Sequence, residues 1–177
     1  MDFIIKIFWL FIPAGVANMS PVLFRWVPFG AGAVDFGKKI KNKPILGPHK
    51  TFRGFLAGII SAILVVYVQT IIYPLTTSLS LINYSETNAL KLGFLLGTGA
   101  LVGDAIKSFF KRRIGVPPGK PWVPFDQIDW IVGALIAVNL IIKIDYKSAL
   151  AAIILFGLMH PIVNLIGYFL KVKKNKF

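Results

Sequence analysis

Five apolar stretches, each close to the length that crosses a bilayer, constrain the fold of this chain more than any other feature. A membrane-spanning helix needs about 20 mostly apolar residues. The stretches lie at about residues 3–26, 54–74, 90–110, 128–146 and 148–170. Hydrophobic residues make up 56% of the chain, against roughly 45–50% in soluble domains. The sequence therefore predicts an all-α, polytopic membrane protein with five transmembrane helices, forming a single domain over residues 1–177.

The distribution of lysine and arginine predicts the orientation of these helices. Basic residues are enriched in the cytoplasmic segments that flank membrane helices. Most of the 20 basic residues fall in loop 25–53, loop 107–127 and the tail from residue 171, which five helices place on one side. The exceptions are Lys6, Lys91, Lys143 and Lys147. We therefore expect the N-terminus outside, the C-terminus inside, and both loops in the cytoplasm beneath the cell membrane.

The N-terminal stretch lacks the basic start and the small-residue cleavage site of a signal peptide, so we expect it to remain as a membrane helix. The net charge of +13 is large for so apolar a chain. Because the charges lie in membrane-flanking loops, anionic lipid head groups or phosphorylated substrates are the expected partners, not nucleic acid.

A dense polar segment, residues 103–130, separates two of the apolar stretches. It contains three of the seven carboxylates in the chain, Asp104, Asp126 and Asp129. Its five basic residues are Lys107, Lys111, Arg112, Arg113 and Lys120. Ionisable groups near a bilayer are costly unless they are paired, hydrated or functional. Carboxylates bind divalent metals, and metals and neighbouring cations bind phosphate oxygens, so this segment favours a phosphate-handling site.

The spacing of the three aspartates favours convergence. Asp126 and Asp129 lie three residues apart at the start of the fourth stretch, on one helical face. The helix N-terminus there offers free N–H groups. Asp104 lies about one turn inside the third stretch, so the three carboxylates meet if these helices are neighbours. The alternatives are a helix cap for Asp126, a solvated Asp129, and an ion pair of Asp104 with Lys107 or Lys111.

Several basic and hydroxyl side chains are placed to bind the same ligand. Ser108 and Lys111 share a helical face with Asp104 or Lys107. Thr51 is placed to cap the second helix, which would direct Lys50 at a bound anion. The alternative for the basic residues is electrostatic anchoring to anionic lipid, which we favour for Arg113.

Polar residues inside the apolar stretches have two interpretations. Asn18, which lies near Ser20 and Pro21, either belongs to a kinked helix that packs on its neighbours or lines a buried cavity. His160 precedes Pro161 and is more typical of a packed residue at a helix kink, while His49 is more typical of a loop residue than of a ligand. Gly93, Gly97, Gly99 and Gly103 permit close helix approach.

Two motifs on the same predicted side resemble a known family. Gly103-Asp104, Ser108, Lys111-Arg112 and Asp126-x-x-Asp129 are similar to the signature of membrane CTP:phosphatidate cytidylyltransferases. Pro48-His49-Lys50-Thr51-x-x-Gly54 resembles their Pro-Lys-Lys-Thr-x-x-Gly segment. The short five-helix length, residues 46–54 and Asp35-Phe-Gly37 resemble the archaeal branch, the CDP-archaeol synthases, more closely. Gln127 stands where arginine follows the first aspartate in the bacterial and eukaryotic enzymes, which also favours that branch. The resemblance covers about residues 20–170.

The resemblance implies a cytidylyltransferase that joins CTP to an unsaturated isoprenoid ether-lipid phosphate, with Mg²⁺ as cofactor. It implies metal binding by Asp104, Asp126 and Asp129, with Lys111 also in the catalytic set. The implied substrate-binding residues are Asn18, Asp35, Lys50, Thr51, Ser108 and Arg112. Phosphoryl-type displacement needs positioning and charge neutralisation more than a protein nucleophile, which agrees with the absence of cysteine.

Two other function classes agree less well with the sequence. A CDP-alcohol phosphotransferase is also membrane-bound and aspartate-dependent, but its Asp-Gly-x2-Ala-Arg motif is absent. A small transporter or channel with basic cytoplasmic loops is the main alternative. It should place ionisable groups near the bilayer midplane, whereas here they cluster at the predicted membrane surface. The oligomeric state is not predicted by the sequence.

Overall fold

Five α-helices and one short hairpin make up the computed structural model, which describes residues 2–117 and 120–169. The helices are α1 (Asp2–Leu23), α2 (Phe52–Thr76), α3 (Ala89–Arg113), α4 (Phe125–Val138) and α5 (Tyr146–Phe169), with a 3₁₀ turn η1 (Thr77–Leu79) after α2. The strands β1 (Lys39–Ile40) and β2 (Lys43–Pro44) pair antiparallel. Apart from this hairpin in the first loop, the prediction of an all-α fold is confirmed.

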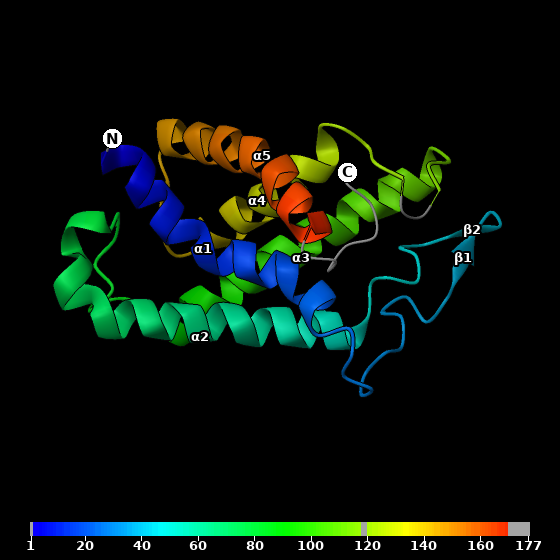
Figure 1. Ribbon diagram of the computed structural model, residues 1–177, viewed down its shortest axis with the longest axis horizontal. Coiled ribbons are helices and arrows are strands. Elements are labelled where there is room, and N and C mark those ends of the chain that lie inside the picture. The colour runs from blue at the N-terminus through cyan, green and yellow to red at the C-terminus, as the bar shows by residue number, and fades with distance from the viewer. Residues whose placement is uncertain (1, 118–119, 170–177) are drawn as a thin grey trace.

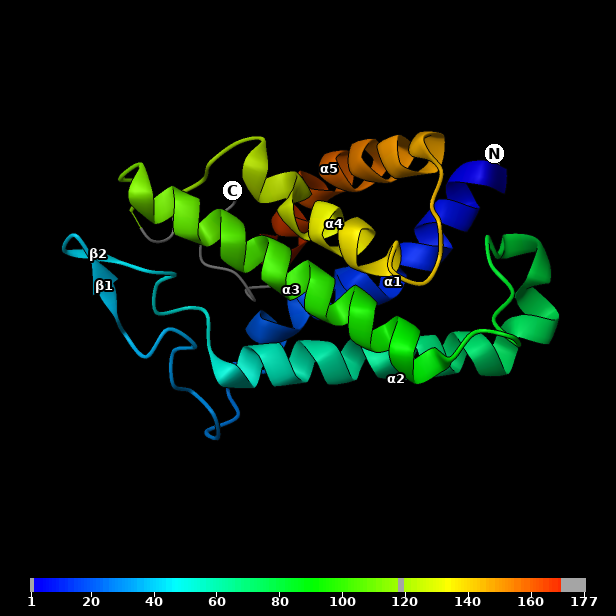
Figure 2. The same ribbon diagram turned by 180° about the vertical axis from the view of Figure 1, so that it is seen from behind.

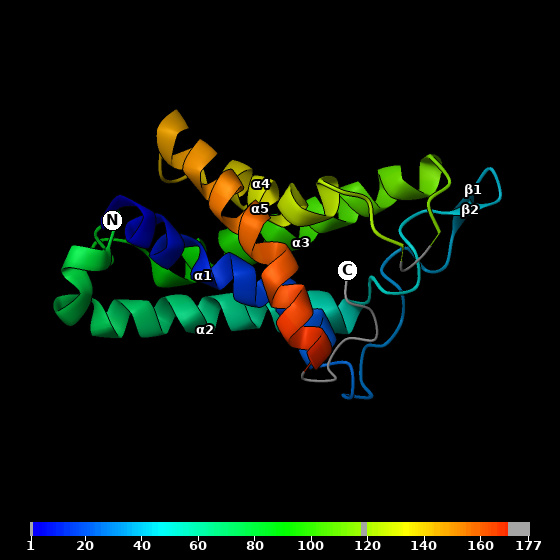
Figure 3. The ribbon, with the colours of Figure 1, turned by 45° about the horizontal axis from the view of Figure 1, so that its top comes forward.

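Helix α1 is the centre of the bundle, since it packs against each of the other four α-helices. Its inward face carries Ile7, Leu10, Phe11, Ala14 and Ala17, all fully buried. Helix α3 packs against α2 over its first half and then runs obliquely along α4 toward the hairpin end, and α4 and α5 lie on the side of α1 away from α2 (Figures 1 and 2). Helix α5 crosses the others obliquely (Figure 3).

Among the described residues, four helices are long and apolar enough to cross a membrane, namely α1, α2 with its 3₁₀ extension, α3 and α5. Their outer faces expose large apolar side chains such as Leu64 and Leu158, as expected for contact with lipid. The chain is thus a membrane-embedded, multi-pass protein. The basic tail from Lys171 to Lys176, on which part of the predicted orientation rests, lies outside the described residues.

The predicted fourth stretch, residues 128–146, is helical only in part. Helix α4 has 14 residues and is about 21 Å long, short of the roughly 30 Å hydrocarbon core. The prediction that the helix continues to residue 146 was wrong. The Asn139 side chain donates to the carbonyl of Leu135 at 2.9 Å and accepts from the N–H of Ile144 at 3.1 Å. These bonds end the helix and fold the chain back toward α5.

Glycines on two faces of α3 set its close contacts with its neighbours. Gly97 faces α2, where an added Cβ would lie 3.1 Å from the Cα of Ile59. Gly99 faces α4, where an added Cβ would lie 2.6 Å from the carbonyl oxygen of Gly133. The contact at Gly99 is closer than real Cβ atoms come and the contact at Gly97 is tight, so larger residues would push the helices apart. The predicted role of these glycines in helix packing is confirmed.

Candidate active site

The ammonium group of Lys107, on α3, lies among all three predicted aspartates. Its Nζ is 3.2 Å from Oδ1 of Asp104, 2.6 Å from Oδ1 of Asp126 and 3.0 Å from Oδ2 of Asp129. Asp104 lies one turn before Lys107, and the other two lie one turn apart at the start of α4. The predicted convergence is confirmed. The alternative of an Asp104–Lys107 ion pair also holds, because one cation serves all three carboxylates.

A second ammonium group, on Lys111, contacts Asp126 through both carboxylate oxygens, at 2.9 and 2.6 Å. Oδ2 of Asp126 also accepts the backbone N–H of Trp122. Pro124 occupies the N-cap position of α4, so helix capping does not account for this carboxylate. Lys111 is buried; its charge is balanced within the site and not by solvent.

Lys50 brings the first loop to the same place, because its ammonium group forms an ion pair with Asp104. The residue after it, Thr51, is the N-cap of α2 and accepts the backbone N–H of Gly54 at 3.2 Å. The predicted capping role of Thr51 is thus confirmed. Residues 46–50 and the Ser108, Lys111 and Arg112 side chains line one cavity together with Asp104. Two loops far apart in the sequence therefore build one site.

Arg112 is buried at this cavity and donates to the carbonyl of Val116 at 2.6 Å. Its Nε is also buried, and within the described residues it has no hydrogen-bond acceptor. A buried guanidinium donor without an acceptor is costly, and phosphate oxygens are acceptors that match its geometry. The Arg112 side chain is thus well suited to an anionic ligand.

Asp35 organises the first loop from within and does not line this cavity. Its carboxylate accepts the backbone N–H groups of Gly37 at 3.0 Å, Leu46 at 2.8 Å and Gly47 at 3.3 Å. Burial by itself would raise the pKa of Asp35, but these hydrogen bonds to the charged form lower it below its ordinary value. Asp35 therefore fixes the path of residues 46–47, which precede Lys50.

Arg113 joins the hairpin to the end of α3. Its guanidinium donates to the carbonyls of Ile40 at 2.8 Å, Lys43 at 3.1 Å and Pro44, and it lies over the ring of Phe109. In the opposite direction, Nζ of Lys43 donates a hydrogen bond to the backbone carbonyl of Arg113 at 2.9 Å. Both terminal nitrogens of Arg113 thus donate within the protein, and its interpretation as a positive-inside anchor stays a prediction.

A second cavity lies on the other side of the aspartates, toward α1 and α5. Asn18 of α1 and His160 and Asn164 of α5 line it, together with the carboxylates and Lys107. The interpretation of Asn18 as part of a cavity wall is therefore confirmed. The sequence pointed to a packing role for His160 and gave no signal for Asn164. Their position follows from how α5 crosses α1, which no local pattern reveals.

The carboxylates provide suitable donors for a metal ion, although not a preformed chelate. Within residues 2–117 and 120–169, no three acidic, histidine or cysteine side chains are arranged to hold a metal directly. The oxygen atoms are of the kind that Mg²⁺ binds, and they already surround a cation, Lys107. Oδ2 of Asp129 is buried and makes no hydrogen bond of good geometry in this part of the chain. The donor set therefore fits Mg²⁺ in type, provided that Lys107 moves.

Comparison with known proteins agrees with this geometry. The family model described as CarS-like, CDP-archaeol synthase, matches residues 1–177. The CDP-archaeol synthase of Pyrococcus furiosus is 40% identical over 171 residues, covering 96% of each chain. That of Methanocaldococcus jannaschii is 35% identical over 167 residues, covering 93% of this chain and 92% of the other. This chain belongs to the CDP-archaeol synthase family.

A solved structure shares the fold. It is described as an intramembrane enzyme for archaeal membrane lipid biosynthesis, and it matches 89% of this chain and 91% of its own with a TM-score of 0.71 at 29% identity. The description of this structure as an intramembrane enzyme agrees with the membrane helices of this chain. CDP-archaeol synthases by name form a CDP-linked lipid, so a nucleotide and a lipid are the substrates that this site must bring together.

Proposed function

We propose that the protein transfers the cytidylyl group of CTP to an unsaturated isoprenoid ether-lipid phosphate, 2,3-digeranylgeranylglyceryl phosphate. An oxygen of the lipid phosphate forms a bond to the α-phosphorus of CTP, and the bond from that phosphorus to the bridging oxygen of pyrophosphate breaks. The products are the CDP-lipid and pyrophosphate. The observation that carries this proposal is the convergence of three carboxylates with Lys50, Lys107 and Lys111.

The basic residues on the first-loop side of the aspartates would bind the CTP phosphates. Lys50 and Lys111 present ammonium groups at the cavity that Arg112 also lines. Developing negative charge on the pyrophosphate leaving group is then stabilised by fixed cations in a partly buried site. Ser108 contributes a hydroxyl to the same wall. Thr51 and Asp35 act indirectly, by fixing the start of α2 and the loop that carries Lys50.

Asp104, Asp126 and Asp129 would hold Mg²⁺. Bound there, the metal would neutralise phosphate charge and polarise the α-phosphorus. Three carboxylates facing one point repel each other unless a cation lies between them, and Lys107 supplies that cation within the chain. We propose that Lys107 keeps the carboxylates in place and turns toward a phosphate oxygen when CTP binds.

The topology we propose has the hairpin end of the molecule in the cytoplasm, where CTP is found. The short helix α4 would enter the membrane from that side and carry the aspartates at its beginning. Five membrane-inserted helices, with the N-terminus outside, agree with the basic residues that flank the hairpin end of α3.

The transporter alternative is less well supported, because the three carboxylates of the site are all paired with lysine side chains and two of them lie at the start of α4. The deciding experiment uses purified protein in detergent with Mg²⁺, radiolabelled CTP and the ether-lipid phosphate. We expect label in the lipid fraction and matching pyrophosphate release, both lost with EDTA. Absence of label with this lipid phosphate and with phosphatidate, in folded protein, would contradict the proposal.

A further inference from the structure

The loop between α1 and β1, residues 24–38, exposes large aromatic side chains. Trp26 and Phe29 are 74% and 77% exposed. The loop projects sideways beside the start of α2, at the end of the molecule where the hairpin lies (Figures 1 and 2). Large apolar side chains gathered on an exposed surface indicate a contact with a protein or a membrane. These two rings therefore fit a partner other than residues 2–117 and 120–169.

The backbone of this loop is fixed even though its rings are exposed. The backbone N–H of Arg53 donates to the carbonyl of Gly30 at 2.8 Å, and that of Phe52 donates to the carbonyl of Gly32 at 3.1 Å. The guanidinium of Arg53 also donates to the carbonyl of Val27. The exposure of the two rings is thus a property of a hydrogen-bonded loop, which presents them at a defined position beside α2.

The same backbone pairing extends to the candidate site. The N–H of Val34 donates to the carbonyl of Lys50 at 2.8 Å, and Ala33 forms a bridge with Thr51. Lys50 forms the ion pair with Asp104, and Thr51 caps α2. Loop 24–38 therefore runs alongside the segment that brings Lys50 to the aspartates. A displacement of the loop would reach Lys50 through main-chain hydrogen bonds.

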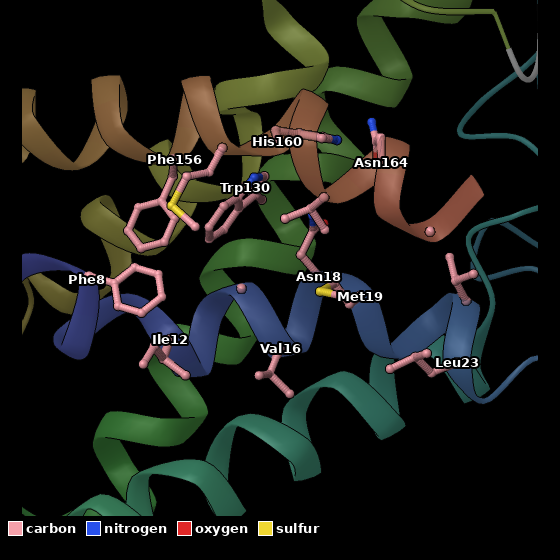
Figure 4. Close-up of a pocket in the computed structure, with 15 residues that line it drawn as sticks. Phe8, Ile12, Val16, Asn18, Met19, Leu23, Trp130, Phe156, His160 and Asn164 are labelled. Carbon is pink, nitrogen blue, oxygen red and sulfur yellow. The ribbon is translucent and has the colours of Figure 1, made fainter. Parts of the chain in front are cut away.

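The exposed apolar surface of α1 continues into this loop. Met19 and Leu23, on the last two turns of α1, are exposed and line the apolar pocket between α1 and α5 (Figure 4). Phe24 follows directly and is also exposed. Aromatic side chains are enriched where the hydrocarbon core of a membrane meets the head groups. The exposed Arg25, next to Trp26, has the charge that anionic head groups attract.

We propose that Trp26 and Phe29 lie among the lipid head groups, and that this contact holds the adjoining segment with Lys50 in the position that binds CTP. The occupant of the surface is an anionic lipid layer, because the rings are apolar, Arg25 is basic and the loop continues a membrane helix. The link to CTP rests on the function proposed above. The position of the two rings in the membrane does not.

The depth of the loop can be measured directly, because the chain contains no cysteine and one introduced cysteine can carry a spin label. Phe29→Cys places the label in the loop. Leu64→Cys places it on the lipid-facing surface of α2, and Lys41→Cys at the turn of the hairpin. All three positions are exposed, so labelling should leave the fold intact. The proteins are reconstituted in phosphatidylglycerol vesicles, and relaxation of the label by oxygen and by a water-soluble nickel chelate is compared.

Oxygen concentrates in the hydrocarbon core and the nickel chelate stays in water, so the ratio of the two effects reports depth. We expect the label at Phe29 to fall between those at Leu64 and Lys41. A label at Phe29 that is as accessible to nickel as the one at Lys41 would overturn the proposal. Low access to both reagents would assign the loop to a contact with protein, which also refutes it.

The link to CTP is tested by replacing both rings with serine. The Trp26→Ser, Phe29→Ser double variant should keep the wild-type unfolding temperature, because both side chains are exposed. Its KM for CTP should rise about five-fold, as expected if Lys50 is in place only one fifth of the time. Tyr146→Ser, at an exposed aromatic residue that begins α5, should match wild type.

A conservative variant and the wild-type protein complete this test. Trp26→Phe should restore the wild-type KM for CTP when Phe29 is kept. An unchanged KM in the double variant would refute the link between the membrane contact and Lys50. Wild-type protein that makes no CDP-lipid contradicts the proposed function itself, and the depth measurement then still decides where the rings lie.

Discussion

The Cα atom of Gly103 lies against the backbone carbonyl of Asp129, so that no side chain fits between them. This contact fixes the spacing of α3 and α4 at the level of the aspartates. Since Asp104 follows directly on one helix, the distance between its carboxylate and that of Asp129 depends on a glycine. Lys107 spans that distance with bonds of 3.2 and 3.0 Å.

Gly103→Ala should therefore impair both stability and activity. Overpacking at a close contact costs about 1–3 kcal/mol of unfolding free energy or more, and separation of the helices would pull the carboxylates away from Lys107. Thermal unfolding in detergent and CDP-lipid formation measure the two effects. Gly32→Ala is the control, because a Cβ there meets no atom within 4 Å. A Gly103→Ala protein with wild-type stability and rate would contradict the packing argument.

Asp104→Asn should abolish transfer and leave the protein folded. The substitution keeps the size of the side chain but removes the charge that pairs with Lys50 and Lys107. We expect kcat/KM to fall by about 100-fold or more, the scale of removing one preorganised electrostatic group. Asp2→Asn, at an exposed carboxylate remote from the site, should behave as wild type. Full activity in Asp104→Asn would remove this residue from the proposed metal ligands.

Lys107→Met should make the stability of the protein depend on Mg²⁺. Without the ammonium group, three carboxylates face each other with Lys50 and Lys111 as their remaining partners, and their repulsion lowers the unfolding temperature in EDTA. Added Mg²⁺ should then raise that temperature more in the variant than in wild type. Lys91→Met, at an exposed position, should show the wild-type response. Equal Mg²⁺ effects in Lys107→Met and wild type would refute the role of Lys107 as the internal cation.

Asp35→Asn should weaken CTP binding through the first loop. Charge-assisted hydrogen bonds contribute about 1.5–3 kcal/mol each, and the amide replaces a carboxylate that accepts three backbone N–H groups. We expect KM for CTP to rise about ten-fold with a smaller change in kcat, because Asp35 positions Lys50 and does not touch the reacting atoms. An unchanged KM for CTP would contradict this indirect role.

The lowered pKa of Asp35 also predicts how acid affects this loop. A carboxyl whose pKa is lower in the folded state stabilises the fold fully above its ordinary value of 3.8. That contribution is lost as the pH falls through the folded-state pKa. Wild-type stability should therefore decrease below about pH 4 more steeply than that of Asp35→Asn. Parallel pH profiles of unfolding temperature for the two proteins would count against the assignment.

Much of the site could be predicted from sequence because helical spacing and membrane topology are local properties. The three-residue spacing of Asp126 and Asp129 placed them on one face, and the positive-inside pattern placed the basic loops together. The role of Lys107 could be predicted only in part. Its separation from Asp104 in the sequence indicated an ion pair within α3. Its contacts with Asp126 and Asp129 depend on how α3 and α4 pack.

The end of α4 and the contacts of Arg113 could not be predicted for the same physical reason. Residues 128–146 are mostly apolar, and the helix ends within them where the Asn139 side chain bonds to the backbone on both sides. Arg113 sits in a basic run typical of a membrane anchor, yet its acceptors lie in a hairpin about seventy residues earlier. Such long-range partners leave no periodic signal in the sequence.

The acceptors that Arg113 uses in the hairpin are backbone carbonyl groups, and every amino acid carries one. These three hydrogen bonds therefore constrain the path of the main chain and do not themselves depend on which side chains the hairpin carries. The hairpin can accumulate substitutions at Ile40 during divergence while the arginine stays fixed. We accordingly expect sequence variation among relatives to be concentrated on the hairpin side of this contact.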